Sequence, residues 1–262
     1  MTKVLAIANQ KGGVGKTTTT VNLAASLAAT KKKVLLIDLD PQGNATTSSG
    51  VDKQGVEAGA YDVLMGQALM ADVIHSSVEV GYDVLAGNSD LTAAEIGLLE
   101  LEQKEHKLKK AIDTIKHNYD FILLDCPPSL SMLTINGLSA AQGVIIPMQC
   151  EYFALEGLTD LITTIEGVKQ TANPSLEIEG ILRTMYDPRN SLTKDVSDQL
   201  KAHFSDKVYR TCIPRNVRLA EAPSFGQPVI SYDKHSKGAM AYLALAGEMI
   251  RRHECEAESE TA

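Results

Sequence analysis

The sequence has no tryptophan, few other aromatic residues and no long apolar run. A helix that spans a bilayer needs about 20 consecutive apolar residues, and no segment approaches that length. An apolar strand pattern starts at Lys3, which leaves no room for a signal peptide. We therefore expect a cytoplasmic protein that does not bind membranes.

Closely spaced cysteines are also missing. The four cysteines, at positions 126, 150, 212 and 255, are widely scattered, and no C-x-x-C pair occurs. This spacing argues against a zinc or iron–sulfur site within one chain and favours buried free thiols. An iron–sulfur cluster shared across a dimer needs only two cysteines per chain, so the spacing leaves that possibility open.

Net positive charge is absent from the chain as a whole but present in one part of it. The 262 residues carry a formal net charge of −8, which argues against wholesale nucleic-acid binding. Between Arg183 and Arg252, however, twelve Lys and Arg residues stand against seven Asp and Glu residues. An anionic partner is therefore expected to meet the C-terminal third of the chain.

A glycine-rich segment, Gln10–Thr18, lies between an apolar run at Val4–Ala8 and a helical pattern that starts near Lys16. A strand that ends in a glycine-rich turn and opens a helix can cradle phosphate groups. Glycines without a Cβ let backbone N–H groups converge on a polyanion, and the segment holds Gly12, Gly13 and Gly15. The segment therefore predicts a nucleotide site.

The two lysines of this loop are expected to have different roles. Lys16 can place its charge on the β- and γ-phosphates, and the Thr17 hydroxyl can take one Mg²⁺ position. The match to the phosphate-loop pattern G-x-x-x-x-G-K-[ST] is imperfect, because Gln10 stands where the first glycine belongs. Lys11 is poorly placed to reach its own phosphates but could reach a nucleotide held by a facing subunit. The active site would then be a property of a dimer.

Carboxylates follow two other apolar strands. Asp125 ends such a strand and is expected to hold Mg²⁺ through a bound water. Asp38 and Asp40 bracket Leu39, but Pro41 breaks the strand and places Asp40 on a loop. Asp40 could orient the attacking water while Asp38 lies nearer the metal. The spacing does not decide which of them does which task.

Apolar runs alternate with helical patterns along most of the chain. We expect strands near residues 3–8, 33–38, 82–86, 119–125, 143–147, 178–185 and 208–213, and helices near 17–32, 61–65, 91–118, 155–171, 191–204 and 237–252. Residues 41–50 are expected to form a polar loop. The order predicts an α/β fold with a doubly wound, mostly parallel sheet and helices on both faces, so that the motifs meet at one sheet edge.

The domain organisation follows from the same pattern. Residues 1–252 form one predicted domain without a long linker. Residues 253–262 are rich in glutamate and poor in apolar residues, so we expect a disordered acidic tail. Residues 51–90 are the least informative stretch, and the sequence does not decide whether they form a surface that binds a partner.

Four motifs carry a resemblance to a known family. They are K-G-G-V-G-K-T-T at Lys11–Thr18, D-L-D-P-Q-G-N at Asp38–Asn44, L-L-D-C-P-P-S at Leu123–Ser129, and I-P-R-N-V-R-L-A-E-A-P-S-F-G at Ile213–Gly226. Together they resemble the ParA/Soj family of partition ATPases, in the deviant Walker A group of P-loop NTPases. The resemblance runs from Lys3 to about Arg252, and the combination of motifs is far more specific than the loop alone.

The resemblance implies an ATPase that uses ATP and Mg²⁺ and forms a sandwich dimer when ATP is bound. Lys11 then matches the lysine that contacts the nucleotide of the other subunit, and Asp40 the carboxylate needed for hydrolysis. The nucleotide-binding positions implied are Lys11, Gly12, Gly13, Val14, Gly15, Lys16, Thr17 and Thr18, with Pro214 and Asn216 lining the adenine pocket. The two loops would approach closely at Gly12.

The family resemblance also implies partners. Such ATP-bound dimers bind double-stranded DNA without sequence preference, and a ParB-like protein at centromere-like sites stimulates hydrolysis and releases them. Arg189 and Arg218 match family arginines that contact DNA, and both lie in the basic third of the chain. Arg215, Lys234 and Lys237 are weaker candidates. A cytoplasmic, nucleoid-associated protein is the expectation.

Other functions share the loop. A MinD-like membrane ATPase needs a basic amphipathic C-terminus, whereas residues 253–262 are acidic. A nitrogenase-reductase-like electron carrier would need two cysteines that share a cluster across the dimer; Cys126 and Cys150 lie in roughly the right half of the chain, but Cys126 precedes two prolines as in the partition pattern. A capsule-type tyrosine kinase would carry a tyrosine-rich tail, and the sequence has none. A small-molecule ligase on the same fold would need a substrate pocket. The nearest alternative is a related positioning ATPase with another cargo.

Overall fold

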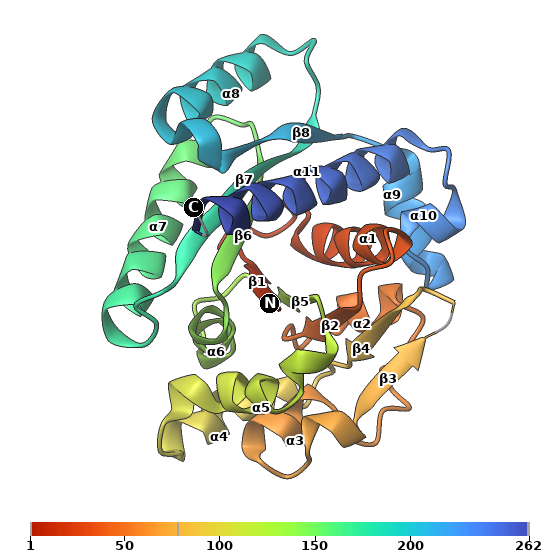
Figure 1. The fold of residues 1–262 in the computed structure, drawn as a ribbon, viewed down its shortest axis with the longest axis vertical. Helices are drawn as coiled ribbons and strands as arrows, with labels where there is room; N and C mark the ends of the chain where they lie inside the picture. Colours follow the sequence, from red (N-terminus) through yellow and green to blue (C-terminus); the bar gives the residue numbers. More distant parts are fainter. Residues whose placement is uncertain (1, 78, 261–262) are drawn as a thin grey trace.

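The computed structural model describes residues 2–77 and 79–260, and an eight-stranded sheet forms its centre (Figure 1). The strand order is β3-β4-β2-β5-β1-β6-β7-β8. The strands are β1 Lys3–Ile7, β2 Val34–Asp38, β3 Ile74–Ser77, β4 Tyr82–Leu85, β5 Phe121–Asp125, β6 Gly143–Gln149, β7 Glu177–Tyr186 and β8 Val208–Pro214. Among the strands of the described residues, only β3 runs antiparallel to its neighbour. The predicted fold class is confirmed.

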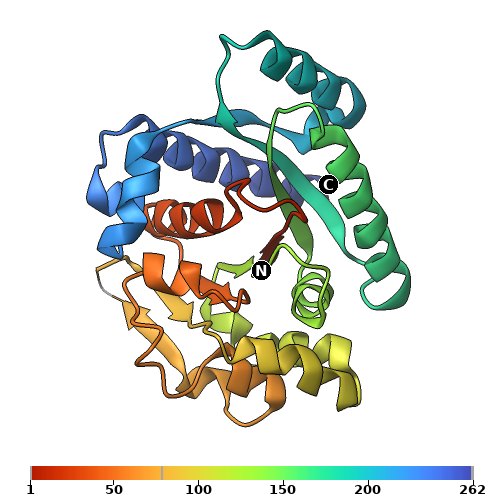
Figure 2. The same cartoon turned by 180° about the vertical axis from the view of Figure 1, so that it is seen from behind.

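Helices cover both faces of the sheet (Figures 1 and 2). The α-helices are α1 Lys16–Ala29, α2 Asn44–Ser48, α3 Ala60–Met65, α4 Leu91–Gly97, α5 Lys107–Ile115, α6 Met132–Ala140, α7 Ala154–Thr171, α8 Ser191–Phe204, α9 Val217–Glu221, α10 Val229–Tyr232 and α11 Lys237–Glu260. Helices α1 and α11 lie on one face, and α4 to α7 lie on the other. None of the described helices has the length and apolar character that a membrane span requires.

The central strands are apolar on both sides because both faces are covered. In β1, Val4 and Ala6 join one core cluster, whereas Leu5 and Ile7 join the other. All five residues of β2 and of β5 are buried. A strand buried on both faces reads as a continuous apolar run, which is why the sequence pattern located these strands well.

Several regions differ from the expectations. Residues 41–50 are not only a loop, because α2 forms inside them. The single helix expected over 91–118 is wrong, since the chain there breaks into α4, α5 and short 3₁₀ turns, with Gln103 at a positive φ of 51°. Strand β3 and helix α6 were not predicted, because β3 is short and only partly buried and α6 has no single apolar face.

The C-terminal helix is longer than expected. Helix α11 continues past residue 252 to Glu260, so the tail that we expected to be disordered is helical up to that residue. Glutamate is a good helix former, and a helix that is already nucleated extends at little cost. Residues 261–262 of the predicted tail lie outside the described residues.

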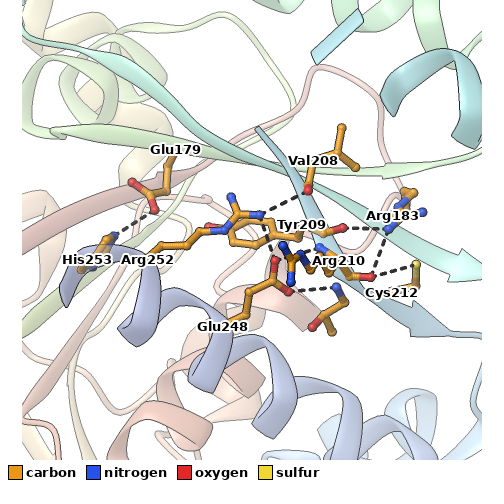
Figure 3. A network of polar contacts seen from close by, with 10 residues as sticks. Glu179, Arg183, Val208, Tyr209, Arg210, Cys212, Glu248, Arg252 and His253 are labelled. Carbon is orange, nitrogen blue, oxygen red and sulfur yellow. Dashed lines mark hydrogen bonds and ion pairs between the residues drawn. The ribbon is translucent and has the colours of Figure 1, made fainter. Parts of the chain in front are cut away.

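Strand β8 lies at the end of the sheet, and side chains from α11 satisfy part of its backbone (Figure 3). Glu248 accepts hydrogen bonds from the N–H groups of Arg210 (2.8 Å) and Thr211 (2.9 Å). Arg252 donates to the carbonyl oxygen of Val208 (3.2 Å) and to Glu248 (2.8 Å). These contacts protect an edge that could otherwise pair with another chain.

Arg183 of β7 also contacts β8, from the neighbouring strand of the sheet (Figure 3). Its guanidinium is buried and donates to Ser197 Oγ (2.9 Å) and to the carbonyl oxygen of Tyr209 (2.7 Å). It lies where the register between β7 and β8 shifts, so it replaces strand pairing that the irregularity removes. Arg183 and Arg252 therefore serve the fold, and the basic character of the C-terminal third is not all available to a partner.

Candidate nucleotide site

The predicted motifs meet at one edge of the sheet, as expected. Strand β5 lies between β1 and β2, and its last residue, Asp125, stands level with Ile7 on one side and Asp38 on the other. The loop after β1, the loop after β2 and Asp125 therefore share the carboxyl edge. In open parallel sheets, ligands bind in this position.

The glycine-rich loop has the backbone that a phosphate cradle needs. Gly13 and Gly15 have positive φ values of 74° and 88°, which side chains resist. Gly15 lies directly before α1, so the free N–H groups of that helix face the loop. Thr184 fixes the loop from β7 by donating to the carbonyl oxygen of Val14 at 2.8 Å. The loop is therefore held ready for an anion.

Lys16 is nearly buried beneath this loop. Its exposed fraction is 7%, and its ammonium donates to the carbonyl oxygen of Lys11 at 3.2 Å. Burial lowers the pKa of Lys16, although Asp125 and Asp40 partly offset the effect. A buried ammonium is stable only beside negative charge. The polyphosphate of a nucleotide supplies that charge.

Asp125 and Thr17 form the oxygen set that Mg²⁺ prefers. The Thr17 hydroxyl donates to Asp125 Oδ2 and the Thr20 hydroxyl donates to Asp125 Oδ1, both at 2.8 Å. Burial, with the neighbouring Asp38 charge, raises the pKa of Asp125 to about 8. A carboxylate destabilised in this way gains from a nearby cation. A hydroxyl and a carboxylate fit a hard divalent ion that keeps several waters.

The two aspartates after β2 are placed differently. Asp40 lies on the loop, as predicted, and its Oδ1 accepts a hydrogen bond from the N–H of Gln42 at 2.9 Å. Asp38 is fully buried and already accepts hydrogen bonds from the Asp40 N–H and from both the N–H and the hydroxyl of Thr46. Both Asp38 oxygens are therefore engaged within the chain, and the metal role of Asp38 and the hydrolytic role of Asp40 stay predictions.

Lys11 points away from the buried part of the loop. Its ammonium pairs with Glu151 at 2.8 Å, and 45% of its side chain is exposed. A Cβ added to Gly12 would meet no atom within 4 Å, so packing within one chain does not require a glycine there. The pair Lys11–Glu151 was missed by sequence reasoning, because Glu151 is 140 residues away and carries no motif.

The two predicted adenine-pocket residues lie at the end of β8 and just after it. Pro214 ends β8 and lines a cavity of about 430 Å³ together with Tyr186 and Met240. Asn216 caps α9, accepting a hydrogen bond from the N–H of Leu219 at 3.3 Å. The adenine-binding role of Pro214 and Asn216 stays a prediction.

Both predicted DNA-contacting arginines are engaged with carboxylates. Arg189 forms a bidentate pair with Asp187, at 2.9 and 2.7 Å. Arg218 pairs with Glu221 at 2.8 Å and with Asp233 at 3.4 Å. The side chains of Arg189 and Arg218 remain 88% and 50% exposed, and exposed pairs of this kind contribute little stability. A phosphate could replace these carboxylates at low cost.

The cysteines give no support to an electron carrier. Cys126 and Cys150 are both buried, and burial raises the pKa of both thiols. Neither side chain is thus placed on a surface where a second subunit could share a metal cluster. Within the described residues, no group of three or more His, Cys, Asp or Glu residues could hold a metal ion.

Comparisons with known proteins agree with this geometry. A family model described as an AAA domain matches residues 2–178. The chromosome partitioning protein ParA of Caulobacter vibrioides is 52% identical over 95% of this chain and 94% of its own. The sporulation initiation inhibitor protein Soj of Bacillus subtilis is 52% identical over 95% of this chain and 98% of its own.

A solved structure matches the fold along nearly the whole chain. Cobyrinic acid a,c-diamide synthase from Mycobacterium smegmatis, with bound ADP and magnesium, has a TM-score of 0.85 and 38% identity. The match covers 97% of this chain and 96% of that one.

Proposed function

Because this chain belongs to the ParA/Soj family of chromosome-partitioning ATPases, we propose that it segregates DNA through a cycle of ATP-dependent dimerisation and hydrolysis. The chain is a P-loop ATPase, and ATP and Mg²⁺ are the ligands of its nucleotide site. In the proposed cycle, an ATP-bound sandwich dimer binds double-stranded DNA without sequence preference. A ParB-like partner stimulates hydrolysis and releases the dimer, which gives a cytoplasmic, nucleoid-associated protein.

The placement of Lys11 and Gly12 is the observation that carries this proposal. Lys11 is half exposed at the edge of the nucleotide loop, and its partner Glu151 is itself exposed. Exposed ion pairs are weak, so a nucleotide phosphate from a second subunit can take the place of Glu151. The open space beside Gly12 supports a close approach of two loops there.

Each site residue then has a task in hydrolysis. The loop N–H groups and Lys16 hold the β- and γ-phosphates, and Thr17 with Asp125 holds Mg²⁺. Mg²⁺ held by Thr17 and Asp125 would supply positive charge beside the phosphates when bound. Asp40 orients the attacking water, because its carboxylate lies on the loop at the same sheet edge as Lys16.

An ATPase assay with added partners tests the proposal. Hydrolysis is measured with the protein alone, with DNA, with the cognate ParB-like protein, and with both together, and Lys16→Ala gives the background rate. Strong synergy between DNA and the partner protein supports partition. Stimulation by anionic phospholipid vesicles instead would favour a membrane ATPase, and rates equal to the Lys16→Ala background would overturn the proposal.

A further inference from the structure

We propose that Thr46 is a positioning residue for ATP hydrolysis, acting through Asp38 on the loop that carries Asp40. This inference rests on the proposed hydrolytic role of Asp40. The motif D-L-D-P-Q-G-N ends at Asn44, so Thr46 lies two residues beyond it.

Asp38 connects the end of β2 to both sides of the loop. Its Oδ1 accepts a hydrogen bond from the Asp40 N–H at 3.1 Å. Its Oδ2 accepts two more, from the N–H and the hydroxyl of Thr46, both at 2.8 Å. One buried carboxylate therefore fixes the backbone at Asp40 and the first turn of α2 together.

The Thr46 hydroxyl adds a third segment to this arrangement. It accepts a hydrogen bond from the N–H of Gly87 at 2.8 Å while it donates to Asp38. A Cβ on Gly87 would lie 2.5 Å from the carbonyl oxygen of Asp38, so the chain after β4 presses directly against the end of β2. Thr46 thus ties together the end of β2, helix α2 and the segment after β4.

Burial makes these bonds hard to replace. Asp38 and Thr46 are fully buried, and Asp40 is 9% exposed. Water cannot take over a hydrogen bond there, so loss of the hydroxyl leaves the Gly87 N–H without a partner. The loop would relax to recover that bond, and Asp40 would move with it. A displacement of 1 Å at a reacting group can cost about 10²-fold in rate.

A second buried hydroxyl in the same segment separates positioning from stability. Ser49 follows α2, is fully buried, and bonds the carbonyl oxygen of Ala45 and the hydroxyl of Tyr82, both at 2.8 Å. Neither bond involves Asp38. Ser49→Ala therefore removes comparable hydrogen bonds from the segment without touching the link to Asp40.

The experiment compares Thr46→Val, Thr46→Ser and Ser49→Ala with the wild type in steady-state ATPase assays with Mg²⁺. We expect Thr46→Val to lower kcat by about 10- to 100-fold, with KM for ATP within about twofold. Size-exclusion chromatography should show that its ATP-dependent dimer persists longer than that of the wild type, because ATP is held but hydrolysed slowly. Thr46→Ser keeps the hydroxyl and should restore kcat, and Ser49→Ala should resemble the wild type.

Asp38→Asn provides an independent variant should Thr46→Val fail to fold. An amide can keep its oxygen toward Thr46, but its NH₂ then faces the Asp40 N–H and displaces it, so the same fall in kcat with unchanged KM is expected. A wild-type kcat in Thr46→Val or Asp38→Asn overturns the inference, as does an equal loss in Ser49→Ala. If the wild type itself neither hydrolyses ATP nor dimerises, the proposed function fails as well.

Discussion

At the scale of single residues, the site places ionisable groups where water cannot stabilise their charged forms. Lys16 is 7% exposed and Asp125 is fully buried, and their pKa values move in opposite directions because burial penalises both charged forms. Each charge gains from the ligand component that it faces, phosphate for Lys16 and Mg²⁺ for Asp125. Nucleotide binding is therefore favoured because it stabilises the charged forms that burial destabilises.

Asp40→Ala should abolish hydrolysis without removing nucleotide binding, because Asp40 lies on the loop after β2 and outside the glycine-rich segment Gln10–Thr18. The ATP-bound state would then accumulate. We expect this variant to elute as a stable dimer in ATP and Mg²⁺, measured by size-exclusion chromatography with light scattering. Lys16→Ala serves as the control that cannot dimerise, and a monomeric Asp40→Ala protein would contradict the sandwich dimer.

The stability of the ligand-free protein should fall as pH rises from 6 to 8. The pKa of Asp125 is about 8 in the folded protein against an ordinary 3.8, so between these values the folded state binds more protons than the unfolded state. Stability then decreases with pH, by up to about 1.4 kcal/mol per pH unit. Thermal melts at fixed ionic strength check this.

The matched control for that measurement is Asp125→Asn, which cannot ionise. Its melting temperature should change less between pH 6 and 8 than that of the wild type. The same dependence in both proteins would show that Asp125 does not cause it.

At the scale of elements, β8 and α11 depend on each other. Strand β8 leads directly from the edge of the sheet to Pro214 and α9, where the adenine and DNA residues are expected. Its pairing with β7 is irregular, and Glu248 and Arg252 of α11 take over part of the backbone bonding (Figure 3). Packing of α11 therefore sets the position of a strand that carries two predicted functional regions.

Glu248→Ala should destabilise the protein by about 3 kcal/mol, because two backbone N–H groups and Arg252 lose their acceptor at a nearly buried position. For a chain of this size, that corresponds to roughly 6–12 °C in melting temperature. Glu254→Ala removes an exposed glutamate from the same helix and should change the melting temperature little. Equal melting temperatures for the two variants would contradict this account of the sheet edge.

At the scale of the whole molecule, charge is divided along the chain. The segment from Arg183 to Arg252 is positive, whereas the remainder is strongly negative. The fold uses Arg183 and Arg252 internally, which lowers the positive charge that a partner can meet. A dimer would bring together two copies of the remaining basic surface. Each additional phosphate contact raises the affinity for DNA and makes that affinity more sensitive to salt. This favours DNA binding by the dimer over binding by the monomer.

DNA retention should require ATP, weaken steeply with salt, and fall in Arg218→Glu. The substituted glutamate would face Glu221 and Asp233 as well as the DNA phosphates, so both repulsion and a lost contact act against binding. Electrophoretic mobility shifts at several salt concentrations measure this. Lys109→Glu reverses an exposed charge outside the basic third and is the control. Equal retention by wild type and Arg218→Glu would discard the assignment of Arg218.

Sequence reasoning located the strands around the nucleotide site and the residues within its loops. It worked there because the signals are local, a continuous apolar run for β2 and β5 and glycine spacing for the loop. It failed between residues 91 and 118, where the helical sequence pattern continues through Gln103 although the backbone there has a positive φ and the helix is broken.

By itself, the amino-acid sequence determined the fold class, the phosphate loop and the carboxylates that follow the strands, because each depends on residues adjacent in the chain. Only the tertiary structure decided how those groups are held. The partners of Lys11, Arg183 and Asp125 lie 140, 26 and 108 residues away. Contacts at such separations leave no periodic trace in a single sequence, since only chain folding brings the groups together.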